Sequence, residues 1–166
     1  AWIGDFPAFA LDSGILASFW EFPAFALLGI CAGVVAIILM KSVGISRTIA
    51  RRLPIPRWGR PAVGGLAIGI MALWIPEVLG IGYGVTESAL LLHLSLWALI
   101  AIGIAKVAAT PICLGFGFGG GIFSPALVIG AMVGGAFGLI ATGAFPDYSS
   151  GAGAYTIVGM GAVAAA

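Results

Sequence analysis

Charged residues are missing from long stretches of this sequence, and this limits the available folds more than any other feature. Residues 22–40 and 107–146 carry no charged side chain, and only 8% of all 166 residues are charged. A soluble domain has about 25% charged residues, whereas a membrane helix needs about 20 consecutive apolar ones. The chain is therefore expected to be all-α, a polytopic membrane helical bundle, integral to a membrane and without a nucleic-acid partner.

Five apolar segments are expected to form membrane helices. Residues 1–21 are interpreted as an interfacial approach segment. Pro111 should kink or stop the third helix, because proline removes a backbone donor and clashes with the preceding turn. The expected spans are residues 22–40, 61–79, 88–110 and 124–144, followed by a short polar turn, FPDYSSG, and a last, truncated helix.

Between the first two spans lies a basic cluster, interpreted as an extramembrane connection because its prolines should break any helix there. Its basic residues are either a topology signal, which we favour, or a contact for anionic lipids. The positive-inside rule would place this connection in the cytoplasm. The cluster consists of Lys41, Arg47, Arg51, Arg52, Arg57 and Arg60, and the prolines are Pro54, Pro56 and Pro61.

Glycines recur four residues apart within several of the expected spans, which predicts tightly crossing, partly tilted helices. This spacing places them on one helical face, where backbones can approach closely. The pairs are Gly29 and Gly33, Gly65 and Gly69, Gly130 and Gly134, and Gly134 and Gly138.

A glycine-rich stretch, LGFGFGGGIFSPALVIGA, contains the pattern G-x-G-x-x-G at Gly115, Gly117 and Gly120. A dinucleotide site is excluded here, because that pattern needs a preceding strand and an acidic residue about 20 positions later. Backbone that is not helical at membrane depth must be buried by protein or line a cavity. A helix starting near Pro125 would point unpaired N–H groups and a positive dipole end outward, where a small anion can bind. The alternative is a helix–helix contact in which glycine is only a spacer.

At GGIFSPALVIGA the sequence resembles the CLC family of voltage-gated chloride channels and chloride/proton antiporters. The match is to the family's G-x-F-x-P motif and the small-residue helix after it. Further stretches resemble the family in the same order: WEFPAFALLGICAGVVA, PEVLGIGYG, AKVAATPICLGFGFGGG and GAGAYTIVGMGAVAAA. The resemblance covers nearly the whole chain.

The resemblance implies chloride transport across the cell membrane by a homodimer, with chloride as the transported ligand and no cofactor. The main-chain N–H groups of Ile122 and Phe123 would coordinate the anion, in a site formed by Gly121, Ile122, Phe123, Ser124 and Pro125. The family's two halves are inverted repeats. Residues 1–60 would be the end of the first half with the basic connection, and residues 61–166 part of the second half, in one partial transmembrane domain.

The family's serine, gating glutamate and pore tyrosine segments have no counterpart here, and the chain is expected to be an excerpt of a longer protein. In the family the connection between the halves lies on the outer face, which conflicts with the positive-inside rule, so its orientation stays open. Channel and antiporter also remain alternatives. The rival hypothesis is a noncatalytic membrane scaffold whose glycine break serves only packing.

Lys106 is the only cation in its apolar surroundings. It either raises the local potential for anions, or it snorkels to the surface or pairs with an acid such as Glu87, since intramembrane charges are costly and often functional. Cys31 and Cys113 are interpreted as packed thiols, without the spacing of a metal site. We find no nucleophile–base pair and no metal cluster in the sequence, so an enzyme is disfavoured.

Overall fold

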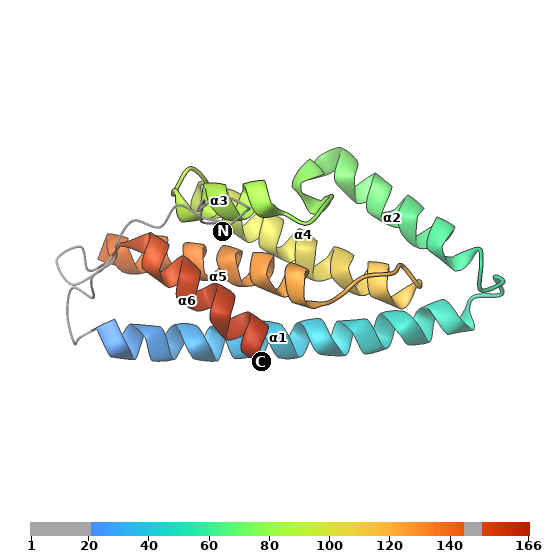
Figure 1. Cartoon of the computed structure of the whole chain (residues 1–166), viewed down its shortest axis with the longest axis horizontal. Helices are drawn as coiled ribbons and strands as arrows, with labels where there is room; N and C mark the ends of the chain where they lie inside the picture. The colour runs from blue at the N-terminus through green and yellow to red at the C-terminus, as the bar shows by residue number, and fades with distance from the viewer. Residues whose placement is uncertain (1–20, 145–150) are drawn as a thin grey trace, which may run out of the picture.

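The computed structural model describes residues 21–144 and 151–166. The predicted all-α fold is confirmed, since the described residues form helices and connecting turns (Figure 1). The predicted approach segment up to residue 20 and most of the polar turn FPDYSSG lie outside the described residues. The helices are α1 (Glu21–Arg52), α2 (Arg60–Trp74), the 3-10 turn η1 (Pro76–Val78), α3 (Tyr83–Leu90), α4 (Leu96–Gly115), α5 (Phe123–Ala144) and α6 (Ala152–Ala165).

Helices α1, α4 and α5 are each long and apolar enough to cross a membrane. The first helix was expected to end at Met40. Helix α1 instead has 32 residues and continues to Arg52. The expectation was wrong because the first proline of the basic cluster is Pro54, so nothing interrupts the hydrogen bonding before it. At 1.5 Å per residue α1 is about 48 Å long, which exceeds the roughly 30 Å thickness of a hydrocarbon core.

Helix α2 ends at Trp74 and is therefore shorter than the predicted span of residues 61–79. Ile75 leaves the helical region, with φ −136° and ψ 84°, as expected for a residue that precedes a proline. Trp58 and Trp74 flank the helix, and each is 85% exposed. Tryptophans at both ends of an apolar helix are typical of the two membrane interfaces.

The predicted span of residues 88–110 is divided between two helices. Helix α3 ends at Leu90, Leu92 takes a positive φ of 57°, and Ser95 then caps α4 by accepting a hydrogen bond from the Ala98 amide at 3.3 Å. Pro111 does not stop α4, which continues to Gly115. Proline costs the helix one hydrogen bond, and a membrane helix tolerates this where packing supports it; Pro111 is buried.

The predicted close helix crossing is confirmed for α5 and α6, which lie side by side in Figure 1. A Cβ atom on Gly130, Gly134 or Gly138 would collide with backbone atoms of α6. For Gly29 and Gly33 the prediction was wrong within the described residues, none of which lies within 4 Å of a Cβ atom added there. Close approach therefore depends on which face of a helix meets a neighbour, which glycine spacing does not reveal.

The buried core lies where α1, α4, α5 and α6 meet. One cluster joins Leu39 of α1 to Ile129 of α5 and Val163 of α6, and a second joins Leu99 of α4 to Met132 of α5. Ala126 in the first turn of α5 also belongs to the first cluster, and a third cluster packs Ile112 and Cys113 near the end of α4 against Ile68 of α2. The helices on either side of the glycine-rich stretch are thus held in place.

Candidate anion site

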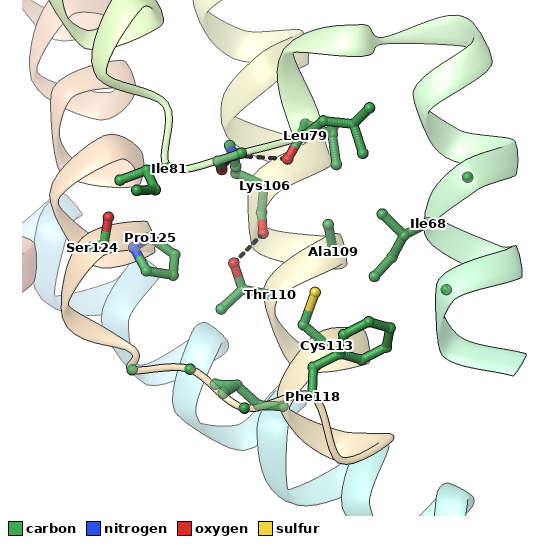
Figure 2. Close-up of a pocket in the computed structure, with 18 residues that line it drawn as sticks. Ile68, Leu79, Ile81, Lys106, Ala109, Thr110, Cys113, Phe118, Ser124 and Pro125 are labelled. Carbon is green, nitrogen blue, oxygen red and sulfur yellow. Dashed lines mark hydrogen bonds between the residues drawn. The ribbon is translucent and has the colours of Figure 1, made fainter. Parts of the chain in front are cut away.

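A cavity of about 570 Å³ lies beside the glycine-rich stretch (Figure 2). Helix α2 forms one wall, α4 a second, and the first turn of α5 a third. The segment after η1 covers one end, and the glycine-rich stretch closes the other. The lining residues are Gly65, Ile68, Gly69, Val78, Leu79, Gly80, Ile81, Lys106, Ala109, Thr110, Cys113, Leu114, Phe118, Gly119, Gly120, Gly121, Ser124 and Pro125.

The glycines between α4 and α5 divide into two groups by their surroundings. A Cβ atom on Gly115 would collide with Ser46 of α1, so this glycine is a helix–helix spacer. Added Cβ atoms on Gly117, Gly119 and Gly120 would meet no atom of residues 21–144 or 151–166 within 4 Å. Gly117 has a φ of +92°, a conformation that side-chain-bearing residues rarely adopt. Packing therefore explains the glycine at the end of α4 but not those that follow.

The backbone from Gly119 to Ser124 presents unpaired amides. Within the described part of the chain, none of these amides donates to a backbone carbonyl, and the first such bond of α5 runs from Ala126 N–H to the Ile122 carbonyl at 3.0 Å. The first N–H groups of a helix have no partner inside it. The predicted helix start at the GIFSP motif is confirmed, since α5 begins at Phe123.

The structure does not bring all five predicted anion-site residues to the cavity wall. Gly121, Ser124 and Pro125 line the cavity, and Ser124 and Pro125 lie on its α5 side in Figure 2. Ile122 and Phe123 do not line it, and the Phe123 side chain is 63% exposed. Any role of these two residues at the cavity would rest on their main-chain amides.

Lys106 lines the cavity from α4, and its side chain is only 4% exposed. Its Nζ donates to the carbonyl oxygens of Val78 at 2.7 Å and Gly80 at 2.9 Å. Snorkelling and pairing with Glu87 were therefore wrong expectations, since the ammonium is buried and Glu87 is an exposed residue of α3. A lysine ammonium has three donors, so the two carbonyls leave one N–H for another acceptor.

Sequence reasoning missed the segment from Val78 to Ile81, which covers the cavity, and Thr110, whose hydroxyl donates to the Lys106 carbonyl at 2.8 Å. The segment's signal was present in PEVLGIGYG, because Gly80 and Gly82 both have a positive φ. A Cβ atom on Gly82 would approach Val128 of α5 to 2.8 Å. Only glycine therefore lets this segment lie closely against α5.

The two cysteines differ in their surroundings. Cys113 is half-buried and lines the cavity, whereas Cys31 is exposed on α1. The prediction of a packed thiol was therefore wrong for Cys31, because its side of α1 meets no neighbouring helix of the described chain.

The cavity is chemically suited to an anion. Its polar side chains are Lys106, Thr110, Ser124 and Cys113, and no Asp or Glu side chain is among the described residues that line it. The adjoining backbone from Gly119 to Ser124 adds amide donors. Charge-assisted hydrogen bonds from N–H groups to an anion are about twice as strong as neutral ones.

A protein-family model described as voltage gated chloride channel matches residues 1–166. The H(+)/Cl(-) exchange transporter ClcA of Cronobacter sakazakii is 41% identical over 105 residues, which cover 63% of this chain and 22% of the relative. Chloride channel protein CLC-f of Arabidopsis thaliana is 35% identical over 180 aligned residues, covering 99% of this chain and 23% of the relative.

A putative chloride channel protein, ClcB-like, of Ralstonia nicotianae is 34% identical over 160 residues, which cover 95% of this chain and 37% of the relative. The chain thus spans between about a fifth and somewhat over a third of the length of these curated relatives.

Proposed function

The chain belongs to the voltage gated chloride channel family, and on this premise we propose that the protein moves chloride across a membrane. The anion is held at the cavity by the main-chain amides of Ile122 and Phe123, within the segment from Gly121 to Pro125. Lys106 raises the electrostatic potential of the cavity for the approaching anion.

One observation carries this proposal: unpaired amides at the start of α5 adjoin a cavity whose described lining holds a cation and no carboxylate. The positive end of the α5 dipole adds to the attraction. Backbone donors and a helix terminus can hold a small anion without an ion pair that would trap it.

The rival function, a scaffold in which the glycine break only packs helices, accounts for Gly115 but not for the glycines after it. At Gly117, Gly119 and Gly120, where a spacer would have a neighbour, no described residue lies within 4 Å of an added Cβ atom. This difference favours the anion site over the spacer.

The chain supplies part of the transport pathway, and the remaining segments of the protein complete it. We propose a homodimer in the cell membrane, with residues 1–60 ending the first half of each subunit and residues 61–166 belonging to the second. Relatives named as an exchanger and as channels both match, so chloride/proton exchange and channel conduction are both open to the complete protein.

Chloride should protect Cys113 from thiol modification, because this side chain lines the proposed anion cavity. The test uses detergent-solubilised full-length protein in which Cys113 is kept. Cys31, and any cysteine that the full-length protein has outside this chain, are replaced by serine. Modification by a negatively charged methanethiosulfonate should be several-fold slower in chloride than in gluconate. The matched control keeps Cys31 and carries Cys113→Ser, and its rate should not depend on the anion, because Cys31 is exposed on α1. An equal Cys113 rate in both anions would contradict the site.

Replacing Lys106 by glutamine should lower the apparent chloride affinity of transport by about tenfold. A unit charge about 10 Å away contributes on the order of 1–2 kcal/mol at an effective dielectric constant near 20. Glutamine keeps a donor for the Val78 and Gly80 carbonyls, whereas Lys106→Met removes both charge and donors. The measurement is chloride flux against concentration in vesicles containing the full-length protein.

Three variants at this position separate the electrostatic role of Lys106 from its structural role. If the charge matters, glutamine and methionine should both weaken the apparent affinity, and Lys106→Arg should retain it. Wild-type flux at every concentration for Lys106→Gln, with a defect only in Lys106→Met, would assign Lys106 to holding the segment after η1.

A further inference from the structure

Three arginines line a second cavity, of about 610 Å³, at the turn between α1 and α2. Arg51 belongs to the last turn of α1, Arg57 to the connection, and Arg60 is the first residue of α2. The connection is tight: the Gly59 amide donates to the Pro56 carbonyl at 2.9 Å. This turn brings together three positive charges that repel one another when nothing lies between them.

No protein group neutralises these charges within the described residues. The described acids are Glu21 at the start of α1, Glu77 in η1 beyond the far end of α2, and Glu87 in α3. Arg60 Nε is buried and has no hydrogen-bond partner in the part of the chain that the structure describes. Buried polar groups are nearly always paired, so this guanidinium nitrogen lacks an acceptor among the described residues.

The surroundings of the arginine cavity indicate the level of the lipid headgroups. Trp58, which lies between two of the arginines in sequence, is 85% exposed, and exposed tryptophans gather at membrane interfaces. On α1, the large apolar side chains of Ile45 and Ile49 are also exposed. Leu66 is exposed on α2, so both helices that carry the arginines also expose apolar side chains near the turn in sequence, which suits acyl chains.

We propose that Arg51, Arg57 and Arg60 bind the phosphate group of an anionic phospholipid. The planar guanidinium donates two parallel hydrogen bonds to phosphate oxygens, which makes arginine well suited to phosphate. The start of α2 adds the positive end of a helix dipole. Free phosphate shares this chemistry, but the exposed apolar side chains beside the arginines favour a ligand that has acyl chains.

The test compares two triple variants of the full-length protein that lose the same charge. The first carries Arg51→Gln, Arg57→Gln and Arg60→Gln. The control carries Lys41→Gln, Arg47→Gln and Arg52→Gln, which lie on α1 and do not line the arginine cavity. Binding of short-chain phosphatidylglycerol to the detergent-solubilised protein is measured by native mass spectrometry. Phosphatidylcholine, which is zwitterionic and has no net charge, is the comparison lipid.

The first triple variant should bind phosphatidylglycerol about a hundredfold more weakly, because each basic residue near an anionic lipid contributes about fivefold. The control should stay within about threefold of wild type, and phosphatidylcholine binding should change in neither. The single variant Arg57→Gln should bind phosphatidylglycerol about fivefold more weakly. Arg57 is exposed and its side chain is not needed for packing, so this variant tests the site even if the triple variant fails to fold.

Three results would overturn the proposal. Equal losses in both triple variants would show diffuse attraction to basic residues, and no loss in either would leave the arginines with a topological role. Inorganic phosphate is a separate arm and should not displace the lipid at equal concentration. Displacement would assign the arginine cavity to a soluble phosphate and overturn the lipid assignment.

Discussion

Replacing the Phe123 amide by an ester should weaken chloride binding about ten- to a hundred-fold. The ester removes one N–H donor at the start of α5 while nearly preserving the shape of the chain. Hydrogen bonds to charged groups contribute about 1.5–3 kcal/mol, which corresponds to this range. The Phe123 amide donates to no backbone carbonyl among the described residues, so the ester breaks no such bond of the fold. The measurement is a chloride titration of the full-length protein by calorimetry.

Phe123→Leu is the matched control, because it keeps the amide and changes only the side chain. That side chain is 63% exposed and does not line the cavity, so much of the chloride affinity should remain. The opposite pattern, with wild-type affinity in the ester and none in Phe123→Leu, would rule out the helix-terminus mechanism. The glycine-rich stretch would then be better explained by packing.

Gly134→Ala should lower the free energy of unfolding by roughly 2–3 kcal/mol, in the upper range for overpacked sites. The new Cβ atom would lie 2.9 Å from Thr156 Cα and would collide with the Tyr155 carbonyl oxygen. Both are backbone atoms of α6, so relief requires the two helices to separate rather than one side chain to rotate. Unfolding in denaturing detergent, followed by circular dichroism, measures the loss.

Gly29→Ala is the control for the general effect of alanine in a helix. A Cβ atom there meets nothing within 4 Å, so stability should be unchanged or slightly higher, as alanine favours helix over glycine. Similar losses in both variants would contradict a specific contact between α5 and α6. Wild-type stability in Gly134→Ala would show that the helices can move apart at little cost.

Much of the helical architecture follows from local chemistry. Residues that carry no charge over 20 positions have few alternatives to a membrane helix, and α5 accordingly covers Phe123–Ala144, almost as predicted. The break before it was also predictable, because a run of glycines weakens a helix and Pro125 suits a first turn. Where the predicted position of a helix end was wrong, the sequence still held a local signal for the true end. Examples are Pro76 after α2 and the capping Ser95 before α4.

The sequence by itself determined that this chain forms apolar helices, interrupted by glycine near an anion motif and by a basic connection. Only the tertiary structure decided which groups meet. Lys106 bonds carbonyls 26 and 28 residues away. Gly134 touches α6, while a Cβ atom on Gly29 would meet no described residue within 4 Å. Arg51, Arg57 and Arg60 share one cavity, while Lys41 and Arg52 line another. Such meetings depend on how whole helices pack and turn against each other, whereas a sequence pattern reports only neighbours along the chain.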